Sequence, residues 1–319
     1  MRNILLFFSF FTLISACKNS DRSFEKNHIY TIATLKGPSS MGMIRLIDSL
    51  NGNASHSLKV EILNEPIQVR RMMLDGTADF AVLPTTMAAI LYNKGLDYRV
   101  IAIPVWGTFY LFGSDTSINR WDDLKGRKIH AMAKGMTPDV MFRYLLLKNG
   151  IDPEKDIRFD YSFPTHIDLA NAIAAGQADL GVIAEPFASL VMKKNKALHP
   201  VFYLNDEWNR LQGSPPATTA LLVKAGIIKS APITVERFIS AYNYSTCWVN
   251  EHPDSAAHLI VKHGIMPEYE VAFNAVQRSA LHFARADSVR RQVTEFLNVF
   301  YLMNPDIIGG KIPDEDFCY

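Results

Sequence analysis

Short apolar runs alternate with stretches of helical periodicity along most of the chain, which is the pattern of an α/β protein. Several runs have the length of a buried strand and precede a turn signal and a helical segment. They predict strands at residues 28–35, 58–63, 98–104, 105–112, 128–133, 157–161, 201–204 and 218–223. Beyond residue 232, apolar stripes with charged faces predict four helices that cover a sheet, at residues 235–250, 253–263, 268–279 and 287–301.

One segment occurs twice, at residues 72–91 and 172–192. Each copy reads as a helix end, a glycine suited to the left-handed C-cap, a short apolar strand, and a proline-marked loop that opens another helix. Two unrelated strand-to-helix turns could look alike, but four identities at a single offset of 100 favour duplication. The chain is therefore predicted to form two similar α/β lobes. The matched pairs are Gly76 and Gly176, Ala78 and Ala178, Asp79 and Asp179, and Val82 and Val182.

The loops after the two repeated strands are the first candidates for a binding site, because ligands of open α/β sheets lie outside the carboxyl ends of the strands. These loops are residues 84–86, Pro-Thr-Thr, and residues 184–186, Ala-Glu-Pro. Glu185 is the one charged residue among them. It could meet a cationic or hydrogen-bond-donating group of a ligand, or it could cap the helix that follows.

Two other loops are predicted to bring helix N-termini to the same space. Ser39 or Ser40 is expected to cap a helix that continues from residue 41, and Thr137 to cap a helix with Pro138 in its first turn. Free backbone N–H groups and the positive ends of two helix dipoles would then face a space shared by the lobes. An ordinary cap without a ligand is the alternative at both places.

The aromatic stretch at residues 105–112 contains Gly107, and a glycine inside a strand permits close backbone approach. Trp106 could stack on a planar ligand or belong to the core. The chain is expected to leave the first lobe near Phe112 and to return near Ser214. The first lobe would comprise residues 28–112 plus 218–319, and the second lobe residues 113–217.

The amino terminus carries an export signal. Arg2 precedes an apolar run at residues 4–13 that is too short to remain as a transmembrane helix. Small residues then precede Cys17, an order that resembles the bacterial lipoprotein box, in which the cysteine is lipidated and becomes the mature amino terminus. We therefore expect a signal peptide at residues 1–16 and a polar tether at residues 17–27 that begins with lipidated Cys17. A cleaved soluble signal with a chance cysteine, or a buried apolar helix, is the alternative.

Composition narrows the function further. The chain has 319 residues, 48% of them hydrophobic, which is enough for two cores, and its net charge of +1 offers no basic field for nucleic acid. The motifs GxGxxG, GxxxxGK[ST], HExxH and GxSxG are missing, and the nine histidines are scattered. We therefore expect no enzymatic activity, no cofactor and no metal, and a small ligand instead. Cys247 and Cys318 are expected to be free thiols.

Together these strings resemble the ABC-transporter substrate-binding lipoproteins of the nitrate/sulfonate/taurine-type (NMT1/THI5-like) group. The resemblance implies a type II periplasmic-binding-protein fold of two α/β lobes with the ligand in the cleft between them. It also implies a monomer at the cell envelope, anchored by lipid and facing the periplasm or cell exterior, whose closed form a membrane permease recognises. The residues that carry the resemblance are 36–43, 89–94, 123–126, 134–138, 185–186 and 309–317.

The resemblance indicates which loops of this chain would bind a ligand, and it does not identify the ligand. The runner-up is an enzyme on the same fold, of thiamine-pyrimidine or menaquinone synthesis. The export signal and the missing cysteine-rich motif of the pyrimidine synthases count against that reading. A sensor lipoprotein without transport is a third possibility. The expected ligand-binding residues are Pro38, Ser39, Ser40, Met41, Pro84, Thr85, Thr86, Trp106, Gly107, Thr108, Met136, Thr137, Glu185 and Phe187.

The residue types in these loops favour one kind of ligand. They offer hydroxyls, helix N-termini and Trp106, but no arginine or lysine, whereas a sulfonate is usually met by a guanidinium or ammonium group. We therefore expect a small, largely neutral or weakly charged organic molecule, such as a planar heterocycle stacked on Trp106. Arg45 or Arg143, each one turn into a facing helix, would overturn this expectation by reaching into the cleft.

Overall fold

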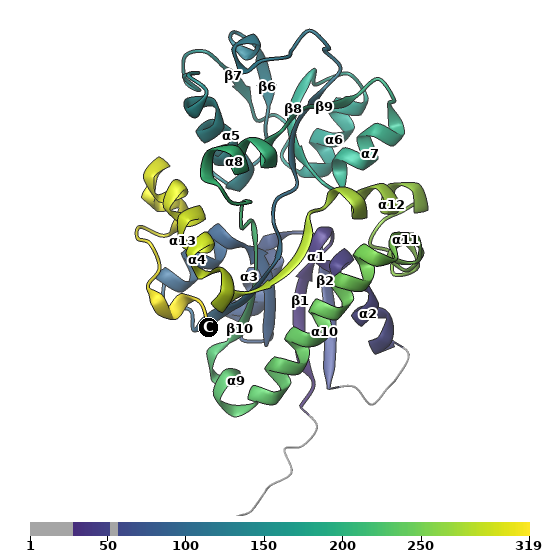
Figure 1. The fold of residues 1–319 in the computed structure, drawn as a ribbon, viewed down its shortest axis with the longest axis vertical. Coiled ribbons are helices and arrows are strands. Elements are labelled where there is room, and N and C mark those ends of the chain that lie inside the picture. The colour runs from purple at the N-terminus through teal and green to yellow at the C-terminus, as the bar shows by residue number, and fades with distance from the viewer. Residues whose placement is uncertain (1–27, 52–56) are drawn as a thin grey trace, which may run out of the picture.

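The structure is a computed structural model that describes residues 28–51 and 57–319, and it forms two α/β lobes (Figure 1). The first lobe is built on a six-stranded sheet with the order β11-β4-β10-β3-β1-β2. The second lobe is built on a five-stranded sheet with the order β7-β6-β8-β5-β9. The predicted α/β class and two-lobe architecture are confirmed. Cys17 and the rest of the predicted signal and tether lie outside the described residues.

The strands of the first sheet come from both ends of the chain. They are β1 (Tyr30–Leu35), β2 (Leu58–Leu63), β3 (Phe80–Pro84), β4 (Tyr98–Val105), β10 (Thr219–Lys224) and β11 (Leu281–Arg285). The second sheet contains β5 (Phe109–Gly113), β6 (Lys128–His130), β7 (Arg158–Asp160), β8 (Leu180–Ala184) and β9 (His199–Tyr203). The predicted exit near Phe112 is therefore placed too late, because β5 pairs with β8 and β9 of the second sheet. The change of sheet falls at residues 106–108.

Helices cover both sheets. Around the first sheet lie α1 (Pro38–Gly42), α2 (Ile44–Asn51), α3 (Pro66–Leu74), α4 (Thr85–Asn93), α9 (Ala225–Ser230), α10 (Pro232–Glu251), α11 (Pro253–Lys262), α12 (Tyr269–Arg278) and α13 (Ala286–Met303). Around the second lie α5 (Thr137–Lys148), α6 (His166–Ala174), α7 (Phe187–Lys194) and α8 (Leu204–Gln212). Short 3-10 turns occur at η1 (Trp121–Leu124), η2 (Pro305–Ile308) and η3 (Glu315–Phe317). Helix α8 and strand β11 were not predicted.

The repeat predicted from the sequence is confirmed in backbone detail. Gly76 and Gly176 both follow a helix with φ of 71°. The N–H groups of Thr77 and Gln177, one residue later, each donate over 2.9 Å to the carbonyl five residues back. Strands β3 and β8 then take equivalent places, since each is parallel to one neighbour and antiparallel to the other. Duplicated sequence thus gives duplicated local structure.

Two predicted helix starts are wrong by one or more residues. Gly37, with φ of 144°, caps α1, and Pro38 takes its first position because its ring pre-sets the helical φ. Ser39 and Ser40 therefore lie inside the helix. In the second lobe Met136 is the cap and Thr137 the first residue of α5, while the side chain of Asp139 accepts the N–H of Gly135 at 2.7 Å.

The lobes share a continuous core on one side. Trp208 of α8 is fully buried and contacts Phe296 and Phe300 of α13, with ring centroids 5.4 and 6.3 Å apart. Helix α13 follows β11 of the first sheet, so this aromatic cluster joins the second lobe to the first. Among the helices of the described residues, none combines the length and apolar character needed to cross a membrane.

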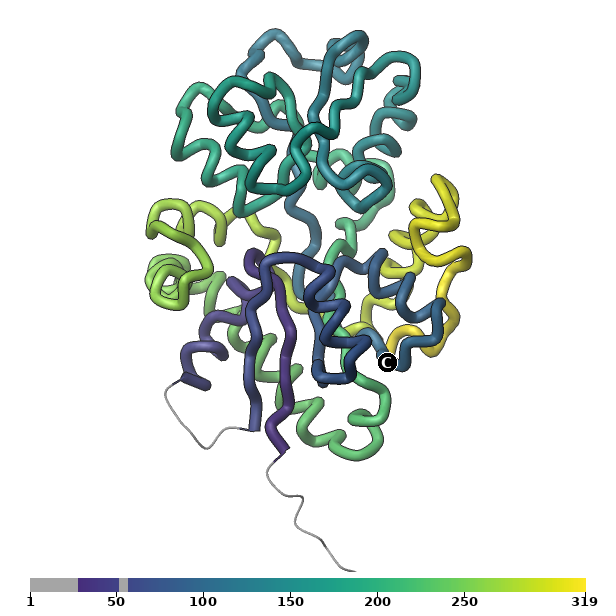
Figure 2. The backbone as a smooth tube through the Cα atoms, turned by 180° about the vertical axis from the view of Figure 1, so that it is seen from behind, coloured from purple at the N-terminus to yellow at the C-terminus, as the bar shows by residue number. Residues whose placement is uncertain are grey.

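The chain passes between the lobes in two segments, one before β5 and one before β10 (Figure 2). Gly107 lies in the first crossing with φ of 100°. A Cβ atom there would lie 2.5 Å from Asn205 Oδ1 and 2.8 Å from Pro216 Cγ. Gly107 is thus required both by its backbone conformation and by the close approach of the second crossing.

We expect Gly107→Ala to lower the free energy of unfolding by about 3 kcal/mol, because left-handed strain and a steric clash add together. Urea denaturation would measure it. Gly150→Ala is the matched control, since Gly150 has φ of 77° but no atom within 4 Å of the place that a Cβ would take. The control should lose only about 1 kcal/mol. Equal losses in the two variants would show that the close approach at Gly107 has no energetic weight.

Candidate ligand cleft between the lobes

The two crossings are held together by the side chain of Thr218. The N–H of Gly107 donates to Thr218 Oγ1 at 2.9 Å, and the same hydroxyl donates to the carbonyl of Val105 at 3.2 Å. Thr218 is buried, so these bonds are shielded from competing water. One hydroxyl therefore fixes the spacing of the two segments through which the lobes are connected.

Each candidate loop of the repeat is joined to one of these crossing segments by a backbone hydrogen bond. The N–H of Thr85 donates to the carbonyl of Thr218, and the N–H of Glu185 donates to the carbonyl of Thr108, each at 3.0 Å. Thr85 and Glu185 occupy equivalent positions of the repeat, at the offset of 100 seen in the sequence. A group bound at either loop would therefore act directly on a crossing segment.

The N-termini of α4 and α5 meet across the lobes. Thr86 Oγ1 and Thr137 Oγ1 lie 2.9 Å apart in a hydrogen bond, and both residues are buried. A hollow of about 220 Å³ adjoins this pair. The hollow is lined by two predicted site residues, Thr86 and Met136. It is also lined by four residues that were not predicted, which are Ile90, Gly135, Asp306 and Ile307. Asp306 and Ile307 belong to η2, whose approach to α4 no local sequence pattern indicates.

The loop at residues 38–41 offers fewer free groups than predicted. Ser40 Oγ accepts the N–H of Gly37 at 3.1 Å, and Ser39 Oγ donates to the carbonyl of Leu35 at 3.2 Å. Met41 is completely buried in the core of the first lobe. These side chains therefore serve the structure of the loop itself.

Trp106 is only 6% exposed and packs in the shared core. Its Nε1 donates to the carbonyl of His282 in β11 at 2.8 Å. The indole thus offers little open face for a stacked ligand in this conformation. Phe187, at the start of α7, stacks on His166 with ring centroids 5.4 Å apart.

Glu185 has the most unusual surroundings of the predicted site residues. Its residue is 2% exposed, and Oε2 accepts the N–H of Ser189 at 3.1 Å, as expected for a cap of α7. Oε1 is also buried, yet no hydrogen-bond partner for it exists among the described residues. Burial raises the pKa of Glu185 from its usual value near 4.5 to about 7, opposed in part by Ser189 and by the charge of Arg278.

Other buried polar atoms lie unpaired at the same ends of the sheets. Within the described residues these include Thr85 Oγ1, the repeat equivalent of Glu185, and Ser189 Oγ on α7. Native proteins satisfy most buried polar groups, so each of these unpaired atoms needs an explanation. A bound polar molecule would supply it.

Neither arginine that could have reached into the cleft is free to do so. Arg143 Nε lies 3.0 Å from Asp139 Oδ1, and Arg143 also donates to the hydroxyl of Tyr161 at 2.8 Å. Arg45 lies over the ring of Trp248 of α10, with its guanidinium carbon 5.2 Å from the ring centroid. Neither guanidinium therefore overturns the expectation of a largely neutral or weakly charged ligand.

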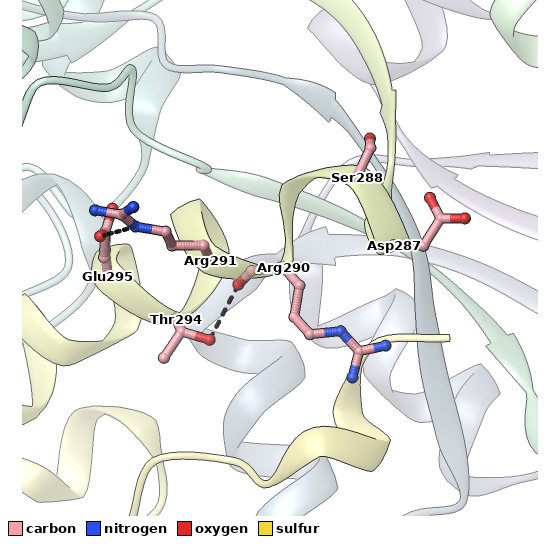
Figure 3. A pocket seen from close by; sticks show the side chains of 6 residues that line it. All are labelled: Asp287, Ser288, Arg290, Arg291, Thr294 and Glu295. Atoms are coloured by element: carbon pink, nitrogen blue, oxygen red, sulfur yellow. Dashed lines mark hydrogen bonds and ion pairs between the residues drawn. The ribbon is translucent and has the colours of Figure 1, made fainter.

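A second hollow, of about 480 Å³, lies on the surface of α13 and contains none of the predicted site residues (Figure 3). Its arginines already have partners. Arg291 pairs with Glu295 at 2.7 Å, and Arg290 donates to the carbonyls of Glu315 and Cys318 at 2.6 and 2.9 Å. This face thus fastens the C-terminal segment to α13. No group of three His, Cys, Asp or Glu residues suited to a metal ion occurs in the described parts of the chain.

Comparison with known proteins decides the family. A family model described as "ABC transporter, phosphonate, periplasmic substrate-binding protein" matches residues 42–223. The chain belongs to this family. The name of this family describes components of ABC transport and implies an extracytoplasmic location. The resemblance inferred from the sequence is thereby confirmed.

Individual relatives agree with this assignment. The chain is 33% identical over 146 residues to the "Putative binding protein YtlA" of Bacillus subtilis, a match that covers 46% of this chain and 42% of the relative. An ABC transporter structure from Parabacteroides distasonis has a TM-score of 0.80 at 25% identity, covering 91% of this chain and 98% of that one. The aliphatic sulphonate binding protein SsuA of Escherichia coli has a TM-score of 0.71 at 15% identity, covering 89% of each chain, and shares the fold.

Glu185 should make the protein less stable as the pH rises. Its pKa is raised in the folded state, so between pH 4.5 and about 7 the unfolded chain loses this proton while the folded chain keeps it. We expect Glu185→Gln to match the wild type near pH 4.5 and to exceed it at pH 8 by about 2 to 3 kcal/mol in the absence of ligand. Urea denaturation at several pH values measures this difference. Glu251→Gln, at an exposed position, is the control. A difference independent of pH would contradict the assignment.

Proposed function

We propose that this protein captures a small organic molecule between its lobes and delivers it to an ABC permease in the membrane. The observation that carries the proposal is the pair Thr85 and Glu185. Each is tied through its backbone to a crossing segment, and each carries a buried polar atom without a partner among the described residues. A ligand that satisfies both atoms would bind the two lobes to each other, and lobe closure is the signal that a permease could recognise.

Ligand contact is assigned to loops 38–41, 84–86, 106–108, 136–137 and 185–187, with Met41 and Trp106 supporting their loops from the core. The family assignment favours capture over catalysis. A sensor lipoprotein would use the same cleft, and a permease and ATPase encoded beside this protein would distinguish transport from sensing. We further propose that the protein acts as a monomer.

Closure of the two lobes can be tested with the small molecule that co-purifies with the protein. Native mass spectrometry of the purified protein would find a co-purified small molecule, and small-angle scattering would then compare stripped and reloaded protein. We expect a smaller radius of gyration in the loaded state, because a ligand bonded to loops of both lobes would hold the lobes together. An unchanged radius with verified, saturating ligand would contradict the proposal.

Membrane attachment is proposed to run through lipid on Cys17. Replacing Cys17 by Ser removes the thiol that would carry the lipid, so the protein should move from the membrane fraction to the soluble fraction. Cell fractionation followed by immunoblotting measures the distribution. Cys247→Ser, which changes an exposed thiol on α10, should leave the distribution unchanged. Full membrane retention of the Cys17→Ser variant would refute the anchor.

A further inference from the structure

We propose that the ligand carries an ammonium or comparable N–H donor group, and that Glu185 Oε1 accepts it together with the hydroxyl of Ser189. This inference rests on the proposed function and names the chemical class of the molecule in the cleft.

Only one of the two carboxylate oxygens of Glu185 has a hydrogen-bond partner among the described residues. Capping of α7 needs one acceptor, and Oε2 supplies it to the N–H of Ser189 at 3.1 Å. Oε1 then remains buried without a hydrogen bond of good geometry among the residues that the structure describes, and the hydroxyl of Ser189 lies close enough to the carboxylate to stabilise its charge without completing such a bond. A buried polar atom without a partner costs about 1 to 3 kcal/mol, and more when it is charged. A simple cap would avoid this cost with a serine or threonine.

The repeat shows that the backbone at this position does not require a charge. The equivalent residue in the first lobe is Thr85, a neutral side chain at the start of α4. The same place in the duplicated structure therefore tolerates a residue without charge. The second lobe has a carboxylate there, so the difference between the lobes is chemical and is explained if the two ends of the ligand differ.

The groups that face Glu185 leave Oε1 open. On β5, Tyr110 uses its hydroxyl to donate to the carbonyl of Arg278 at 3.2 Å. On α12, the guanidinium of Arg278 donates only to Met192 Sδ, at 2.8 Å, among its described hydrogen bonds, and it favours ionised Glu185 through its charge. On α7, Ser189 is neutral. Within the described residues no ion pair joins Arg278 to Glu185, so Oε1 keeps a free acceptor position, while the guanidinium charge opposes a cation there and must be outweighed by the hydrogen bond to Oε1.

A small probe can test the subsite without knowledge of the natural ligand. Methylammonium chloride offers three N–H donors, whereas tetramethylammonium chloride has the same charge and none. At pH 8 and equal concentration, we expect the thermal midpoint of the stripped wild type to be about 2 °C higher in methylammonium. The difference should vanish in Glu185→Gln and persist in Arg278→Met, which removes the neighbouring cation. Equal midpoints in wild type, or an unchanged difference in Glu185→Gln, would overturn the proposal.

The co-purified molecule supplies an independent readout. A molecule with an amine, amidine or similar donor whose binding weakens at least tenfold in Glu185→Gln supports the subsite. A co-purified plain oxyanion, bound equally by both proteins, overturns it. In that second case compaction on ligand binding would still be seen, so failure of the subsite is distinguishable from failure of the proposed function.

Discussion

The arrangement of the two lobes depends on the hydrogen bonds that Thr218 forms. The hydroxyl of Thr218 accepts the N–H of Gly107 and donates to the carbonyl of Val105, both in the same crossing segment. The backbone carbonyl of Thr218 accepts the N–H of Thr85 in the neighbouring loop. A β-branched residue with few rotamers suits this role, because little side-chain entropy is lost when the hydroxyl is fixed. Glycine at position 107 is the complementary requirement, since any side chain there would separate the two crossings.

The contacts between the lobes differ in how easily they can break. Trp208 is fully buried against Phe296 and Phe300, and separating these rings would expose a large apolar area. On the other side, Lys193 of α7 pairs with Glu270 of α12, and both side chains are more than one third exposed. Exposed ion pairs contribute little, about 0 to 1 kcal/mol. The aromatic cluster can therefore act as a lasting joint, and the α7 to α12 contact can open reversibly.

The duplicated segment shows that one backbone arrangement can carry side chains of different chemical character. Both copies end a helix at a left-handed glycine, place a strand beside parallel and antiparallel neighbours, and fasten the next loop to a crossing. The copies diverge after this point, since α4 begins at Thr85 itself, whereas α7 begins at Phe187, two residues after Glu185. A buried carboxylate at one of the two equivalent positions lowers stability without ligand, and functional sites are where such costs are retained.

The sequence by itself determined the features that rest on local spacing. The repeat and its glycine caps depend on hydrogen bonds between residues about five apart, so a short window contains their cause. Tertiary structure decided the rest. The aromatic stretch of β5 joined the second sheet because its pairing partners lie some 70 to 90 residues away along the chain. Arg143 donates to the hydroxyl of Tyr161 outside its own helix, and Glu185 keeps one oxygen unpaired, because both outcomes depend on which other segments pack around them.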